Sequence, residues 1–82
     1  MSLEIGTVVK SLKGRDKEKY FCVVGIDEKS VLICDGKERK LEKPKHKKLK
    51  HLKITQYKLQ TETLQVNKHI KKALKSLNIV EE

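Results

Sequence analysis

The chain has 82 residues, which is the length of one domain and too short for two folded domains that enclose an active site between them. Twenty Lys and Arg outnumber eleven Asp and Glu, and the net charge is +9 at pH 7. Because such an excess destabilises a compact chain by self-repulsion, it indicates a negatively charged partner, either nucleic acid or an anionic membrane surface.

The first half of the sequence is typical of β-structure. Residues 5–12 and 20–27 are rich in β-branched and other apolar side chains, and a turn-like stretch at 13–16 separates them. Residues 31–34 predict a third strand. These runs do not alternate cleanly between apolar and polar residues, which a small barrel tolerates where a strand bends, and Gly25 fits such a bend.

Weaker signals predict two further strands. Asp35-Gly36 is a hairpin signal, because glycine accepts the positive φ of a tight turn. We therefore expect an exposed fourth strand at 37–42, and a short closing strand at 48–54 where Leu and Ile lie among lysines. Short strands at this spacing predict a mainly β fold, a small barrel, over residues 1–54.

The apolar period changes in the tail, where helical spacing separates Val66, Ile70, Ala73, Leu74 and Leu77. This spacing predicts an amphipathic helix over 67–77, with Asn67 as N-cap and Asn78 as stop. Three turns are marginal alone in water, so we expect the apolar stripe to pack on the barrel, with a partner protein or an RNA groove as the alternative. A polar linker over 55–66 then separates the barrel from a helical segment over 67–78.

The densest charge falls in residues 37–53, which hold nine Lys and Arg and two Glu. Pro44 fixes its own φ and pushes Lys43 toward an extended conformation. We expect residues 43–48 to form an extended arm whose ammonium groups match a string of phosphates. An ordinary solvated loop is the alternative, although a block of like charges repels itself without a counter-charge.

A second basic cluster lies in the first turn, where four cations between residues 13 and 19 are interleaved with Asp16 and Glu18. Arg15 beside Gly14 offers a planar guanidinium to a phosphate or an exposed base, and a charged hairpin tip is the alternative. The candidate RNA-binding residues of both clusters are Lys13, Gly14, Arg15, Lys17, Arg39, Lys40, Lys43, Lys45, His46, Lys47, Lys48 and Lys50.

Other chemistries find little support in the sequence. Cys22 and Cys34 lie in strand-like runs and are interpreted as small buried hydrophobes of a reducing compartment. Without a Cys-x-x-Cys motif or a close Cys/His pair, we expect neither a metal site nor a cofactor, and His51 is interpreted as structural. We expect no catalytic residue and no enzyme activity. Without a membrane-spanning stretch or a signal peptide, we expect a cytoplasmic protein.

The order of the motifs resembles a known family. Gly6 to Lys17, with Gly14-Arg15-Asp16-Lys17 at its turn, is similar to the start of a KOW motif, and Asp35-Gly36 and then residues 43–52 continue it. Over residues 5–54 this succession resembles the archaeal and eukaryotic large-subunit ribosomal protein family called "fourteen-e" and its short bacterial KOW-domain relatives. Glu18 stands where many KOW motifs have a second glycine, and Phe21 where some have a third.

The resemblance implies an SH3-like barrel that binds ribosomal RNA, with the loop at 13–17 and the basic segment at 43–51 as contacts. From the residues themselves we expect a monomer that binds structured RNA by electrostatics and shape, because two Tyr and one Phe are too few for a platform of stacked bases. The alternatives are a protein-interaction module accessory to transcription or translation, and an anionic-membrane binder that uses the basic helix but lacks an aromatic anchor. We expect no membrane and no small-molecule substrate among its partners.

Overall fold

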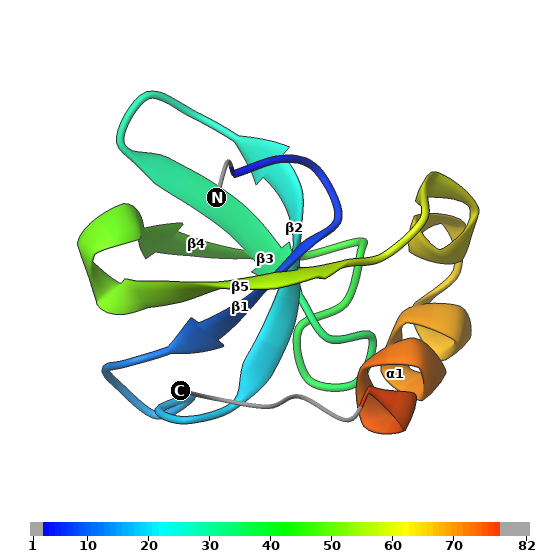
Figure 1. Cartoon of the computed structure of the whole chain (residues 1–82). Helices are drawn as coiled ribbons and strands as arrows, with labels where there is room; N and C mark the ends of the chain where they lie inside the picture. Colours follow the sequence, from blue (N-terminus) through cyan, green and yellow to red (C-terminus); the bar gives the residue numbers. More distant parts are fainter. Residues whose placement is uncertain (1–2, 78–82) are drawn as a thin grey trace.

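A computed structural model describes residues 3–77 of the chain. Its strands form one antiparallel sheet in the order β4-β3-β2-β1-β5, with a single α-helix after the last strand (Figure 1). In chain order the elements are β1 (Thr7–Ser11), β2 (Tyr20–Ile26), β3 (Ser30–Cys34), β4 (Lys45–Lys48), the 3-10 helix η1 (Leu49–His51), β5 (Leu52–Lys58), the 3-10 helix η2 (Thr61–Gln65) and α1 (Asn67–Ser76).

The predicted mainly β fold with a C-terminal helix is confirmed. β1 lies between β2 and β5, so that Val9 has Phe21 opposite it on one side and Ile54 on the other. η1 turns the chain from β4 directly into β5, which brings the two edge strands of the sheet together at that end (Figure 1). This strand order, with a 3-10 turn between the two edge strands, is that of a small β-barrel-like domain.

The sheet buries apolar side chains on both faces, because successive residues of a strand point to opposite sides. One cluster consists of Val9, Phe21, Val23, Val31, Ile33 and Leu52. The other consists of Val8, Cys22, Cys34, Leu59 and Ile70. The apolar runs therefore fail to alternate because both faces are covered. The bend expected at Gly25 is present as an irregular register between Val23 and Gly25.

Helix α1 covers the second of these faces, as expected from its apolar stripe. Ile70 is completely buried there, and Ala73 and Leu74 pack around it. The N-cap position is Val66 and makes no side-chain cap. Asn67 instead accepts a hydrogen bond on Oδ1 from the backbone N–H of Leu41, at 2.7 Å, so this side chain ties the helix to the preceding loop. The stop predicted at Asn78 lies outside the described residues.

The fourth strand expected at 37–42 is wrong, because residues 35–44 form a loop. The Asp35 carboxylate accepts hydrogen bonds on Oδ1 from the backbone N–H groups of Lys37 and Arg39, each at 2.9 Å. Gly36 adopts a φ of 75°, as a turn requires, but the local bonds of Asp35 close the chain into a loop rather than a hairpin.

Two further segments are more ordered than expected. The arm predicted at 43–48 is largely strand β4, whose Lys47 lies opposite Val31 of β3. The polar stretch expected as a linker supplies the second half of β5, which runs to Lys58, and then η2. The barrel therefore extends beyond residue 54, because the backbone of β1 needs a second partner strand whether or not that strand is apolar.

Candidate nucleic-acid interface

The loop between β1 and β2 ends in a β-bulge, where two residues of one strand lie opposite one residue of the other. The backbone of Ser11 bonds both Glu18, whose N–H it accepts at 2.6 Å, and Lys19, to whose carbonyl it donates at 3.0 Å. Glu18 adopts a φ of 69°, and this left-handed conformation at a bulge is one that glycine occupies most easily. Glu18, which stands where a second glycine is common in KOW motifs, therefore adopts a backbone conformation that is typical of glycine.

The β1–β2 loop contacts the segment that follows β3. Lys47 of β4 donates a hydrogen bond from Nζ to the carbonyl oxygen of Lys13, at 2.8 Å. The backbone N–H of Leu12 donates to the carbonyl of His51 in η1, also at 2.8 Å. Two basic segments more than thirty residues apart in the sequence therefore form one surface at the end of the barrel where β4 passes into β5.

We call this surface the basic end and define it by the cations of the β1–β2 loop, β4 and η1. Its members are Lys13, Arg15, Lys17, Lys47, Lys48 and Lys50. Lys19 is paired with Glu38 and is not included, and Lys45 lies at the other end of β4, beside the hollow described below. The two exposed loop cations at its tip, Arg15 and Lys17, make no ion pair within residues 3–77. An edge strand rich in lysine also blocks pairing with another sheet, so part of this charge protects the fold as well.

His51 lies at the centre of the basic end. Removal from water, and then the positive charges of Lys13, Lys50, Lys47 and Lys48, lower the pKa of His51 below its ordinary value. Four lysines from three elements therefore act on one imidazole, which means that their charges are concentrated in space and not only in sequence. From the residues themselves His51 was interpreted as structural, and it entered the expected contacts only as the last residue of the segment 43–51 that the resemblance implies.

A second group of predicted residues surrounds a shallow hollow of about 520 Å³ beside β4. Its lining residues are Glu38, Arg39, Lys40, Glu42, Lys43, Pro44, Lys45 and His46. Two carboxylates offset part of the positive charge here, whereas the surroundings of His51 contain lysines alone among the groups that shift its pKa. The hollow is thus the weaker half of the predicted surface.

Arg39 has a different role from the other predicted cations. Its Nη2 donates to Oδ2 of Asp16 at 3.1 Å, and the Asp16 side chain is only 6% exposed. Lys19 and Glu38 approach within 3.7 Å nearby and join the same two loops. Among the twelve predicted residues, Arg39 thus differs from the other cations, because its guanidinium already has a carboxylate partner. Of the rest, Lys45 and Lys47 are half-buried, and the exposed ones are Lys13, Gly14, Arg15, Lys17, Lys40, Lys43, His46, Lys48 and Lys50.

The remaining reactive groups of the described chain are buried or isolated. The sulfur atoms of Cys22 and Cys34 lie 3.9 Å apart on neighbouring strands, and both side chains are fully buried, as expected. A hydrogen bond to Cys34, together with burial, raises the pKa of the Cys22 thiol, which makes it a poor nucleophile. Among residues 3–77 no group of three or more His, Cys, Asp or Glu is arranged to hold a metal ion.

That same range contains no helix with the length and hydrophobicity needed to cross a lipid bilayer.

The sequence matches no protein-family model and no curated protein. The ligand of the basic end is therefore inferred from the chemistry of its side chains. Ammonium groups from an edge strand, a short helix and a loop tip present many hydrogen-bond donors and few acceptors, which suits a row of phosphates.

Proposed function

We propose that the protein binds structured RNA through the basic end, by contacts with phosphates rather than by reading bases. The observation that carries this proposal is the hydrogen bond from Nζ of Lys47 to the carbonyl oxygen of Lys13, at 2.8 Å, which holds the cations of β4 beside those of the β1–β2 loop. The pKa of His51, which burial and then the charges of the neighbouring lysines lower, agrees with this arrangement. Such a concentration of charge is unfavourable in the free protein and is relieved by a polyanion, whose condensed counterions are released on binding.

The aromatic residues support RNA rather than a peptide as the ligand. Peptide grooves of SH3-like barrels need exposed aromatic side chains. Here Phe21 is completely buried, and Tyr20 and Tyr57 pack as partly buried residues against the second core. The same side chains are too few and too enclosed for a platform that stacks bases.

The resemblance to KOW proteins makes ribosomal RNA in the cytoplasm the preferred target. Gly14 and Glu18 both have positive φ, at 84° and 69°, within the β1–β2 loop. The loop geometry thus agrees with the glycine pattern of that motif at both positions, although one of them holds glutamate. Co-migration with ribosomal subunits in sucrose gradients, retained at low salt and lost at high salt, tests this choice of target.

The binding mode itself is tested by salt dependence. We expect the affinity for an RNA hairpin, measured by fluorescence anisotropy, to fall with salt along a log–log slope of about −4 if about five phosphates are engaged. Replacing Lys48 and Lys50 by Gln makes the slope less steep by about two, because each lost phosphate contact removes about 0.9 from it.

The matched control removes two lysines whose charges are already paired. Lys19 approaches Glu38 and Lys58 approaches Glu4, both in exposed ion pairs. The variant Lys19→Gln/Lys58→Gln has the same net charge as Lys48→Gln/Lys50→Gln. We expect it to keep the slope of the native protein. A native slope near zero, or the same loss in both variants, would show that the basic end is not the contact surface.

A further inference from the structure

Helix α1 carries a second basic surface that the basic end does not include. Its outward residues are lysines, and none of its ten residues is acidic. The exposed cations are Lys68, Lys71, Lys72 and Lys75. None of these four makes an ion pair with another described residue.

The apolar side of the same helix is already used. Ile70 is fully buried, and Ala73, Leu74 and Leu77 pack on the second core. No large apolar side chain of the helix remains to enter a lipid layer, which membrane-surface helices require. The outward face therefore offers charge without hydrophobic anchors, and this combination favours a phosphate backbone over a membrane.

The placement of the lysines weakens the helix. Lys68 and Lys72, and Lys71 and Lys75, are like charges four residues apart, which repel each other on a helix surface. Lys68 also lies in the first turn, where the helix dipole disfavours a cation and the helix itself has no acidic residue, although Glu42 of the preceding loop accepts a hydrogen bond from Asn67 there, at 2.6 Å. Local stability does not explain these choices, whereas a negatively charged partner does.

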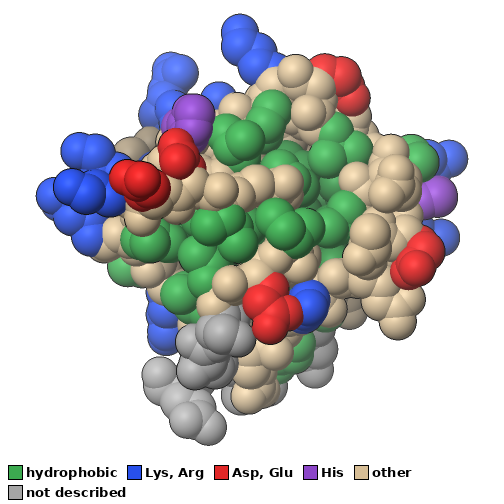
Figure 2. Space-filling model, turned by 90° about the horizontal axis from the view of Figure 1, so that it is seen from above, with side chains coloured by type: hydrophobic (Ala, Val, Ile, Leu, Met, Phe, Trp, Pro, Cys, Tyr) green, Lys and Arg blue, Asp and Glu red, His purple; other side chains and the backbone are tan. Residues whose placement is uncertain are grey.

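The two basic surfaces lie on different sides of a small molecule. In Figure 1 the β1–β2 loop and η1 are at the left and α1 is at the right, with the sheet between them. Figure 2 shows Lys and Arg side chains at the left, along the top edge and at the right, around a central area of hydrophobic side chains. A single straight stretch of RNA cannot follow both surfaces, because the sheet and its cores lie between them.

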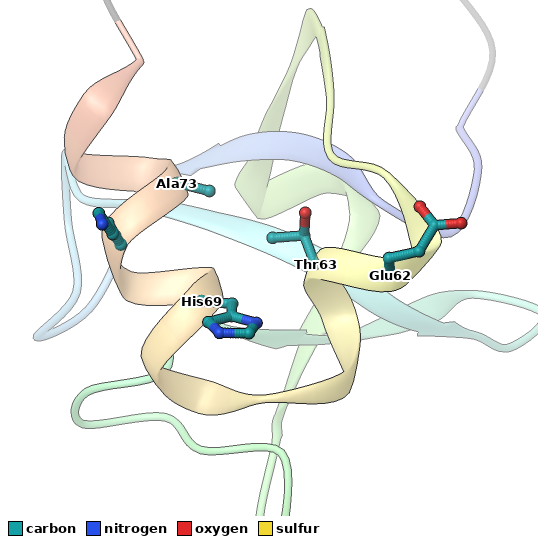
Figure 3. Close-up of a pocket in the computed structure, with 5 residues that line it drawn as sticks. Glu62, Thr63, His69 and Ala73 are labelled. Carbon is teal, nitrogen blue, oxygen red and sulfur yellow. The ribbon is translucent and has the colours of Figure 1, made fainter.

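Side chains that line a hollow between α1 and η2 add hydrogen-bond donors to the helix surface. The hollow has a volume of about 390 Å³ and is lined by Glu62, Thr63, His69, Lys72 and Ala73. In Figure 3 His69 and Ala73 point from α1 toward η2, while Glu62 points away from the helix. His69 and Lys72 therefore extend the outward basic face of α1 at this side.

We propose that the outward face of α1 binds a second RNA segment, so that one protein molecule bridges two segments of folded RNA. This inference rests on the proposed RNA binding by the basic end. The ligand of α1 is recognised mainly by phosphate charge, since the face offers ammonium groups and the imidazole of His69 but no Phe, Tyr or Trp ring.

The test is an energy-transfer assay with donor-labelled and acceptor-labelled copies of one RNA hairpin. The native protein should bring donor and acceptor together at low salt. Lys71→Gln/Lys75→Gln should reduce the transfer by about fivefold or more while changing the affinity for a single hairpin by less than about twofold, because the basic end is intact. The control with the same net charge, Lys19→Gln/Lys58→Gln, should keep both properties. Circular dichroism verifies that α1 remains helical in each variant.

Each other outcome is decisive. A native protein that binds one hairpin but produces no transfer would overturn the bridging proposal and leave the basic end unaffected. The bridging proposal would also be overturned if Lys71→Gln/Lys75→Gln kept the full energy transfer between the two hairpins. It would be overturned too if this variant were defective only in binding phosphatidylserine vesicles. A native protein that binds no hairpin at all contradicts the proposed function itself, and the bridge with it.

Discussion

Arg39 and Asp16 form an ion pair that joins the loop at 35–44 to the β1–β2 loop, with Nη2 of Arg39 3.1 Å from Oδ2 of Asp16. The Asp16 residue is only 4% exposed, so the pair is largely shielded from water. The two loops that carry most of the predicted RNA contacts are therefore fixed to each other before any ligand binds.

Asp16→Ala should lower the free energy of unfolding by about 1–3 kcal/mol, because a partly buried guanidinium loses its charged acceptor. Urea denaturation followed by circular dichroism measures the change. Glu38→Ala, which removes the exposed pair with Lys19, should cost less than about 1 kcal/mol. Equal losses in the two variants would mean that the Arg39 pair is no stronger than a surface contact.

Gly36→Ala should destabilise the protein far more than Gly14→Ala. Both glycines have positive φ, at 75° and 84°, which costs a residue with a Cβ about 1–2 kcal/mol. At Gly36 the added Cβ also meets the carbonyl oxygen of Asn67 at 2.1 Å, whereas at Gly14 its nearest neighbour is the flexible end of Lys47 at 3.4 Å. Thermal unfolding of both variants checks this difference, and comparable melting temperatures would contradict the close packing of the loop on α1.

Glu18→Gly should stabilise the protein by about 1 kcal/mol, because glycine accepts the left-handed conformation at the bulge without the Cβ penalty. It also removes a negative charge beside the basic end, so the affinity for RNA should rise. Urea denaturation and hairpin binding measure the two effects. Glu18→Gln is the control, since it removes the charge but keeps the strained backbone, and it should raise the affinity without the gain in stability.

The pKa of His51 should lie below about 6.5 in the free protein and rise when RNA neutralises the lysines around it. Between its two pKa values the complex then holds more protons, so RNA binding should strengthen as the pH falls below about 6.5. The stability of the free protein depends on pH in the opposite direction. The unfolded chain binds more protons than the folded one in this window, and stability should fall as the pH is lowered through the folded pKa.

NMR titration of the imidazole, with and without an RNA hairpin, measures both values. His51→Gln should remove this part of the pH dependence of binding. A His51 pKa that is unchanged by RNA would show that the phosphates do not reach the lysines of the basic end.

The first three strands were predictable because their β-branched residues are buried whichever way they point. β4 was not, since Lys45-His46-Lys47-Lys48 has almost no apolar signal and becomes a strand only because β3 offers an unpaired edge. The second half of β5 is polar for a similar reason, although Thr55 contributes by donating from Oγ1 to the carbonyl of Val8 at 2.6 Å. Tertiary pairing, not local preference, determines both segments.

For the candidate site, sequence located the two basic clusters but not their arrangement. The Asp35 side-chain bonds that create the loop at 35–44 depend on one rotamer, and the Arg39 pair depends on a partner 23 positions away. Charge density alone cannot separate a cation that holds the fold together from one that faces a ligand. His51 was interpreted as structural for the same reason, because the lysines that act on it belong to three elements.

The position of β1 between β2 and β5 also governs the order in which the fold can be completed. The carbonyl of Gly6, just before β1, accepts the backbone N–H of Leu59 at 2.8 Å. Val8 of β1 is enclosed only when Ile70 of α1 packs on it. During synthesis, β1 emerges before β5 and α1, and it therefore waits for both of them before it is covered. A nascent chain stopped before residue 70 leaves that strand half covered, so truncated products should be targets for proteases rather than shorter working versions of the protein.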